Sequence, residues 1–231
     1  MTHAPARPIP RLVDVAAPPP PKPRLRGVSH QWAFFVSLAL GAALVLTAPG
    51  GRATLAAAVY AASVAGLFGS SALYHRIDWA SVSARTWMRR LDHSMIFLLI
   101  AGTYTPFALL ALEGTLATAI LIAVWGGALA GIAFKLLWIG APKWLVALTY
   151  VLLGWVAVAA FPQMLESIGP AATALVAAGG VLYTVGAVVY ALRRPDPSPA
   201  VFGYHEIFHV LVIVAAALQY AAIAFWVLPG S

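Results

Sequence analysis

Seven stretches of the chain are long and apolar enough to cross a lipid bilayer as helices. A membrane-spanning helix needs about 20 predominantly apolar residues, and turn-forming Gly and Pro residues separate most of the stretches that reach this length. Only 9% of the residues are charged, whereas about a quarter are charged in a soluble domain. The sequence therefore excludes a soluble enzyme and predicts an all-α integral membrane protein, a seven-transmembrane helix bundle. The expected spans are residues 30–48, 53–75, 91–111, 115–138, 143–163, 170–192 and 204–228.

The segment before the first span differs from the rest of the chain. Residues 1–29 are rich in proline, include the run Pro18 to Pro21, and show no periodic apolar pattern. Such a composition is typical of a disordered segment with polyproline character. The first apolar run begins only near His30 and is long enough to remain as a span, so we expect no removable signal peptide. We therefore divide the chain into a disordered, Pro-rich, basic tail (1–29) and a seven-transmembrane domain (30–231).

The basic residues predict the orientation of the bundle. The net charge is +7, but the Lys and Arg side chains do not gather as a nucleic-acid site requires, and we expect no nucleic-acid partner. Of the 14 Lys and Arg residues, 13 lie in the tail and in alternate connections between the spans. Only Arg52 lies on the other side of the membrane in this arrangement. Because cationic loops are retained in the cytoplasm, we expect a cytoplasmic N-terminus, an outer C-terminus, and a multi-pass protein of the cell membrane.

A few ionisable residues lie at the predicted cytoplasmic ends of the spans. Such groups are costly near the bilayer core and need a reason to be there. His205 and His209 are four residues apart, so both imidazoles project from one helix face, and His75 ends the second span at the same depth. The chain has no Cys, so any metal must rest on His, Asp or Glu. Three histidines plus water form an open zinc site of the catalytic type.

Two further residues belong to this predicted site. Asp92 opens the third expected span and could be a fourth ligand or act on a bound water; alternatively it is a helix-start acid facing Arg89 or Arg90. Ser71 lies one turn before His75 on the same face and could hold a substrate carbonyl or the water; alternatively it packs against a neighbouring helix. Zinc is the expected metal, although the same ligands admit iron or manganese.

Three motifs carry a resemblance to a known family. They are Ser71-Ala-Leu-Tyr-His75, then Leu91-Asp92-His93-Ser94 running into Ala101-Gly-Thr-Tyr-Thr-Pro106, then His205-Glu-Ile-Phe-His209. In this order, on spans two, three and seven, they resemble the hemolysin III proteins, the bacterial branch of the progestin and adipoQ receptor superfamily, which is related to membrane hydrolases of the alkaline ceramidase type. The resemblance covers residues 28–231. It implies that His75, His205 and His209 bind zinc, that Asp92 holds a zinc-bound water, and that Ser71 lines the same site.

The last motif also matches a second pattern. His205-Glu206-Ile-Phe-His209 reads H-E-x-x-H, the signature of zinc metalloproteases in which Glu is the general base. The other interpretation, which we favour, is that Glu206 points about 100° away from His205 and faces water at the membrane interface. An intramembrane metalloprotease is therefore the less favoured alternative.

Three other features receive structural interpretations. Pro106 predicts a kink in the third span, which we prefer to a substrate contact by Tyr104. His93 follows Asp92 and is expected to point away from the site. Gly127 and Gly131 form a G-x-x-x-G pattern that favours packing against a neighbouring helix, and it does not show a dimer.

Two classes of function are consistent with this sequence. The first is a zinc-dependent hydrolase of a lipid amide or ester, with a membrane lipid at the inner leaflet as substrate and Asp92 taking the proton. The second is a non-enzymatic membrane-homeostasis or sensor protein with structural zinc, or a cytolysin as the family name suggests. An elongated cavity that joins the zinc site to the bilayer would favour the hydrolase, and a sealed site would favour structural zinc.

Overall fold

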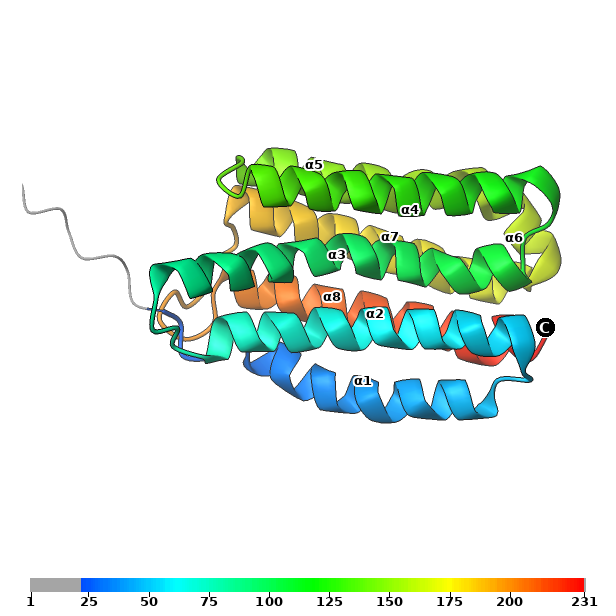
Figure 1. The fold of residues 1–231 in the computed structure, drawn as a ribbon, viewed down its shortest axis with the longest axis horizontal. Coiled ribbons are helices and arrows are strands. Elements are labelled where there is room, and N and C mark those ends of the chain that lie inside the picture. Colours follow the sequence, from blue (N-terminus) through cyan, green and yellow to red (C-terminus); the bar gives the residue numbers. More distant parts are fainter. Residues whose placement is uncertain (1–21, 231) are drawn as a thin grey trace, which may run out of the picture.

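The computed structural model describes residues 22–230, which are almost entirely helical (Figure 1). The fifth span consists of α5, a 3₁₀ turn (Trp155–Ala160) and α6, and the last consists of α8 and a π-helical turn (Ile223–Val227). Seven segments are thus long and apolar enough to cross a membrane, which confirms the predicted fold class. The helices are α1 (Val28–Thr47), α2 (Gly51–Arg76), α3 (Val82–Leu110), α4 (Gly114–Leu137), α5 (Lys143–Gly154), α6 (Phe161–Ser167), α7 (Gly169–Leu192) and α8 (Tyr204–Ala222).

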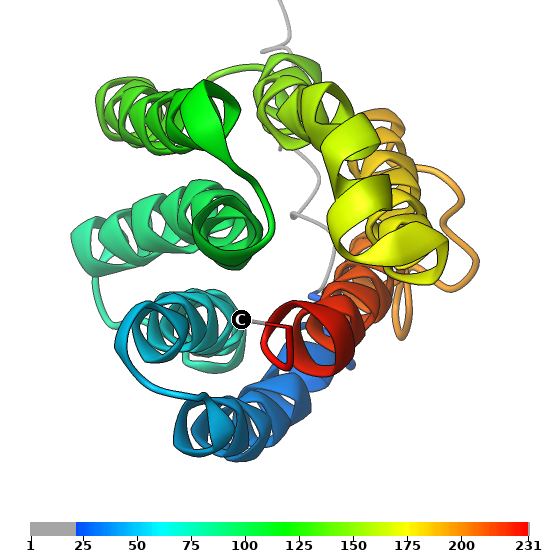
Figure 2. The same cartoon turned by 90° about the vertical axis from the view of Figure 1, so that its right-hand side faces the viewer.

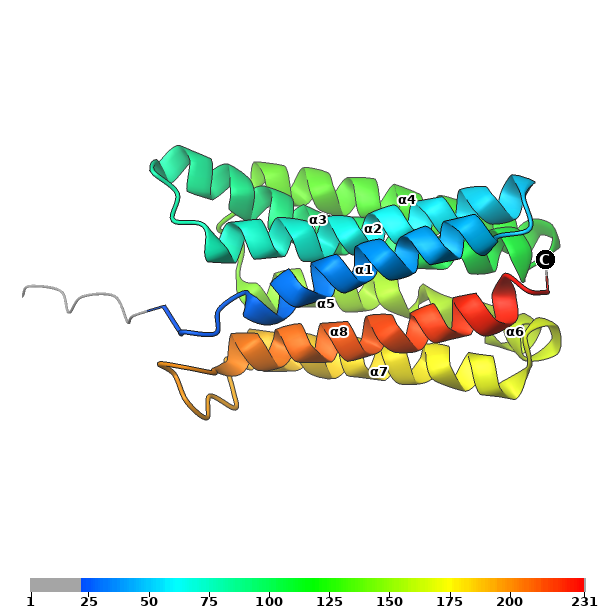
Figure 3. The ribbon, with the colours of Figure 1, turned by 90° about the horizontal axis from the view of Figure 1, so that it is seen from below.

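The helices form a ring of roughly parallel and antiparallel rods. Helices that follow one another in the chain pack side by side, and contacts between α1 and α8 close the ring. Figure 2 shows this ring end-on, and Figure 3 shows α1 lying between α2 and α8. The end of α2 and the starts of α3 and α8 therefore meet at one end of the bundle, which we call the histidine end.

Small residues allow the helices to approach closely. A Cβ atom on Gly131 would lie 2.2 Å from the ring of Phe97 on α3, and one on Gly127 would lie 2.5 Å from Leu153 on α5. The G-x-x-x-G pattern of α4 therefore packs against helices of the same chain, as predicted. Large apolar side chains cover the outside, including Leu137, which is 87% exposed. In a membrane such a surface contacts lipid, which is as apolar as Leu.

Helix α3 is longer than the sequence predicted. It begins at Val82, where the Ser81 hydroxyl accepts a hydrogen bond from the Ala84 N–H at 3.1 Å, the usual cap of a helix start. The basic residues in its first turns lower the hydropathy, and the expected boundary at residue 91 was therefore wrong. Asp92 consequently lies roughly three turns inside the helix, and its interpretation as a helix-start acid is also wrong.

The fifth span is interrupted where Tyr104 touches it. The Tyr104 hydroxyl donates to the Gly154 carbonyl and accepts from the Ala157 N–H, both at 2.6 Å. These bonds satisfy backbone groups that the break leaves without helical partners. Helix α3 itself continues through Pro106, and the Thr105 hydroxyl bonds to the Ala101 carbonyl at 2.9 Å.

The N-terminal segment reaches the bundle before α1 begins. Most of the predicted tail, residues 1–21, lies outside the described residues. Arg24 and Leu25 donate backbone hydrogen bonds to Ala200 and Val201 in the connection between α7 and α8, at 2.9 and 3.1 Å. The backbone then turns at Gly27, whose φ of 79° suits glycine.

Candidate metal centre

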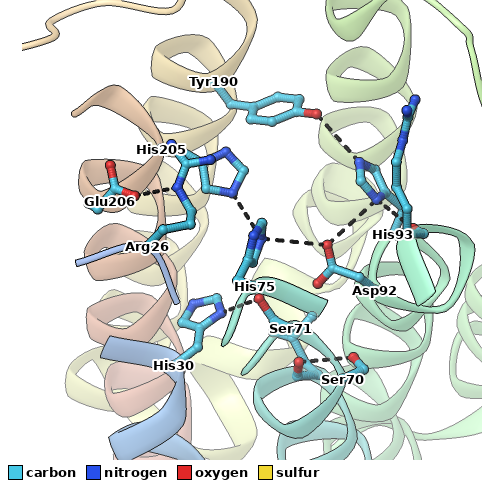
Figure 4. A network of polar contacts seen from close by, with 12 residues as sticks. Arg26, His30, Ser70, Ser71, His75, Asp92, His93, Tyr190, His205 and Glu206 are labelled. Carbon is cyan, nitrogen blue, oxygen red and sulfur yellow. Dashed lines mark hydrogen bonds and ion pairs between the residues drawn. The ribbon is translucent and has the colours of Figure 1, made fainter. Parts of the chain in front are cut away.

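Three histidines meet at the histidine end. His75 lies in the last turn of α2, and His205 and His209 lie one turn apart at the start of α8. One ring nitrogen of each lies within 4.8 Å of the other two, and the Nε2 atoms of His75 and His205 are 3.2 Å apart. Figure 4 shows His75 between His205 and Asp92. The helix period places His205 and His209 on one face of α8, and the packing of the helices into a ring brings His75 of α2 next to them.

The donor set fits a metal cation. Nδ1 of His209 is buried and has no hydrogen-bond partner in residues 22–230, although buried polar atoms are normally paired. Neutral imidazole nitrogens are metal ligands, and three converging rings offer a cation three of them. This cluster could therefore hold a metal ion.

Asp92 and Ser71 stand beside the cluster. Oδ2 of Asp92 is 3.9 Å from Nε2 of His75 and 3.6 Å from Nδ1 of His93. The Ser71 hydroxyl is 2.8 Å from Nδ1 of His30. Asp92, Ser71, His205 and His209 all line one cavity, so the structure brings all five predicted site residues together.

His30 is a neighbour that the sequence analysis missed. It lies in the first turn of α1, is buried, and stacks on His209 with ring centroids 3.7 Å apart and planes inclined by 8°. Together with its bond to Ser71, this stacking fixes the orientation of His209. A histidine inside an apolar run was the available signal, because polar residues in spans need partners.

His93 also belongs to the site, contrary to expectation. Its Nδ1 bonds to the Arg89 carbonyl at 2.7 Å, so Nδ1 carries the proton and Nε2 faces the Tyr190 hydroxyl at 3.4 Å. His93 lines the same cavity as Asp92. The expectation was wrong because Asp92 and His93, although consecutive on α3, both line the cavity.

Glu206 is turned to other partners. It is 2% exposed, forms an ion pair with Arg26 (Figure 4), and accepts the Gly203 N–H at 2.8 Å. The expectation that Glu206 faces water is wrong. Its carboxylate caps the start of α8 and binds Arg26 in the segment before α1. These contacts occupy both carboxylate oxygens, which argues against a role as general base.

The cluster opens onto an elongated apolar cavity. A volume of about 120 Å³ is lined mainly by α3, α5, α7 and α8, and His30 of α1 and Ser71 of α2 also line it. A second volume of about 40 Å³ shares Thr103, Tyr104 and Gln219 in its wall and reaches Phe107 and Met164. Trp155 lines both volumes and is 37% exposed. The histidine site is thus the polar end of a long apolar space.

Known proteins share this sequence pattern. The family described as Haemolysin-III related matches residues 20–220. The chain is 34% identical to Hemolysin-3 of Bacillus cereus over 177 residues, which cover 77% of each chain. It is 33% identical to the Hemolysin-3 homolog of Bacillus subtilis (strain 168), covering 73% of this chain and 75% of that one. It is also 26% identical to the human Monocyte to macrophage differentiation factor, covering 71% of this chain and 67% of the human protein.

Proposed function

The chain belongs to the haemolysin III-related family of multi-pass cell-membrane proteins, and on that premise we propose that it is a zinc-dependent hydrolase of a lipid amide or ester. The observation that carries the proposal is the position of Asp92 between the three-histidine cluster and the apolar cavity. A cluster that served packing alone would need neither the carboxylate nor the space.

His75, His205 and His209 are the ligands in this proposal. Three histidines with a free coordination position are typical of catalytic zinc, and the buried, unpaired Nδ1 of His209 supports a cation at the cluster. When bound, zinc acts as a Lewis acid that polarises a carbonyl group and makes water a nucleophile at neutral pH. No Ser or Cys nucleophile is then required.

Asp92 and Ser71 perform the remaining steps. Asp92 would take the proton from the attacking water and pass it to the alcohol or amine that leaves when the acyl C–O or C–N bond breaks. Its Oδ2 lies 3.9 Å from His75 Nε2 and is not held in a short bond to that ring. Ser71 would donate a hydrogen bond from its hydroxyl to the carbonyl oxygen of the substrate. His30 keeps this hydroxyl at the cavity wall through the 2.8 Å contact.

The cavity supports a lipid as the substrate. The larger volume has a mainly apolar lining and begins at Asp92 and His205. The smaller volume shares part of its wall and reaches Phe107, towards the other end of α3. An acyl chain fits such a space with its polar group at the histidines. With the predicted orientation, the scissile bond lies at headgroup depth in the inner leaflet.

A lipid sensor with structural zinc is the second candidate. The same cavity supports it, because a sensor also has to bind a lipid. The two functions differ at Asp92, which only the hydrolase requires. The names Hemolysin-3 and Hemolysin-3 homolog of two relatives suggest a cytolysin. A secreted pore-former must first be soluble, however, and 62% of this chain is hydrophobic.

The direct test uses the purified full-length chain in lipid vesicles. Vesicles made from a bacterial lipid extract are incubated with the zinc-loaded chain, and lipid mass spectrometry follows the release of fatty acids. We expect one lipid class to be consumed, and no consumption after a chelator removes the metal. Unchanged lipids with a fully zinc-loaded chain would contradict the hydrolase and favour the sensor.

A further inference from the structure

A second group of polar side chains lies deep in the cavity, far from the histidines. Thr103 of α3, Tyr183 of α7 and Gln219 of α8 all line the larger volume, and Thr103 and Gln219 also line the smaller one. We call these three residues the deep polar set. They interrupt a wall that is otherwise mainly apolar.

The deep polar set has no hydrogen-bond partners in residues 22–230. Gln219 is 8% exposed and Thr103 is 6% exposed, and neither side chain takes part in a hydrogen bond within this part of the protein. The Tyr183 hydroxyl is buried and also unpaired. Buried polar groups are normally paired, because leaving them unpaired is unfavourable. The Tyr183 hydroxyl is fully enclosed, whereas the polar groups of Thr103 and Gln219 are accessible from the cavity, where a ligand can pair with them.

Threonines close in sequence to Thr103 and Tyr183 have hydrogen-bond partners. Thr105, two residues beyond Thr103, bonds to the Ala101 carbonyl at 2.9 Å. Thr184, next to Tyr183, bonds to the Gly180 carbonyl at 2.8 Å. A helical threonine ordinarily makes such a bond to the preceding turn. Thr103 does not, and it lines the space that Gln219 lines.

The position of the deep polar set limits the ligand. Ten residues separate His209 from Gln219 on α8, a rise of about 15 Å, and eleven separate Asp92 from Thr103 on α3. We infer that the lipid bound here carries a hydroxyl or carbonyl oxygen part-way along its chain, about 15 Å from the group held at the histidines. This inference rests on the proposed function, because it places the polar end of a lipid at the metal cluster.

Hydrogen-bonding capacity explains why an oxygenated chain fits better than a plain one. The Gln219 amide both donates and accepts, and so does the Thr103 hydroxyl. A chain hydroxyl can satisfy both residues, whereas a plain methylene chain leaves them unpaired. A site that is built to bind an oxygen discriminates against the analogue that lacks it.

The test measures binding and does not depend on turnover. The full-length chain in phosphatidylcholine nanodiscs is saturated with radiolabelled octadecanoic acid, the kind of product that hydrolysis would release. Unlabelled octadecanoic acid and 12-hydroxyoctadecanoic acid then compete for the site. We expect the hydroxy acid to compete about tenfold better, the size of one net hydrogen bond.

Variants connect this preference to the deep polar set. Gln219→Leu should remove the preference while octadecanoic acid still binds, and Thr103→Val should weaken it. Thr105→Val is the matched control on α3 and should keep it. Equal competition by the two acids in the unaltered chain, or a full preference in Gln219→Leu, would overturn this inference and leave the proposed function standing. No binding of octadecanoic acid at all would overturn both.

Discussion

Helices α3 and α4 are neighbours in the chain and in space, yet protein encloses one and leaves the other open to lipid. In their most apolar stretches, 56% of the residues of α3 are buried, against 17% in α4. Helix α3 carries Asp92, His93, Thr103 and Tyr104 into the cavity, whereas no described residue of α4 lines it. Polar side chains in a membrane need a protein environment, so the enclosed helices are where chemistry can reside.

The two helices also use small residues differently. Gly102 of α3 lies so close to α2 that an added Cβ would meet the Ser63 side chain at 2.3 Å. On α4, Gly131 faces α3, but Gly126 has no atom near its Cβ position. Close packing thus surrounds α3, whereas α4 packs on one face only. The predictions below test whether function follows this enclosure.

The largest expected effect concerns the orientation of the bundle in the membrane, because a reporter at the C-terminus is either active or inactive. An alkaline phosphatase fused after Ser231 should be active, and a fluorescent protein at the same place should be dark, because 13 of the 14 basic residues mark the histidine end as cytoplasmic. The opposite pair of results would place Asp92 and the cluster at the outer leaflet.

The largest effect of a substitution should be on metal content. His205→Ala and His209→Ala should each remove nearly all zinc from the purified chain, because two remaining histidines do not complete a site. His93→Gln is the control, since His93 lies beside Asp92 outside the cluster. Elemental analysis measures all three, and full zinc content in the His205 and His209 variants would contradict the ligand assignment.

Asp92 should matter for turnover more than for metal. Asp92→Asn keeps the shape of the side chain and removes its charge, so we expect most of the zinc to remain while lipid hydrolysis falls about a hundredfold or more, the usual scale for a general base. Ser71→Ala should be milder. Loss of zinc in Asp92→Asn would make Asp92 a direct ligand, and unchanged hydrolysis would remove its role.

The smallest effect should separate the two faces of α4. Gly131→Val should destabilise the fold by about 1–3 kcal/mol, the usual cost of overpacking, because its side chain would overlap Phe97. Gly126→Val, on the same helix with open space at its Cβ, should change stability much less. Thermal unfolding in detergent compares the two variants. Equal losses would mean that α4 is enclosed on both faces.

The fold and the candidate ligands could be predicted because their signals are local. Span length and hydropathy gave seven helices, and the four-residue spacing of His205 and His209 placed both on one face of α8. The start of α3 could not be predicted in this way. Residues 82–90 include three arginines, and hydropathy does not distinguish a helix that extends past the hydrocarbon from a loop.

The sequence by itself determined the class of the protein, the number of its spans and the set of residues that could bind a metal, because hydropathy and helix period depend only on neighbours in the chain. Only the tertiary structure decided the partners of each polar group. Glu206 pairs with Arg26, His30 stacks on His209, and Gln219 faces the cavity without a partner. Such choices depend on which helices lie side by side when the ring closes, and a buried polar group is satisfied by whatever those helices bring near it.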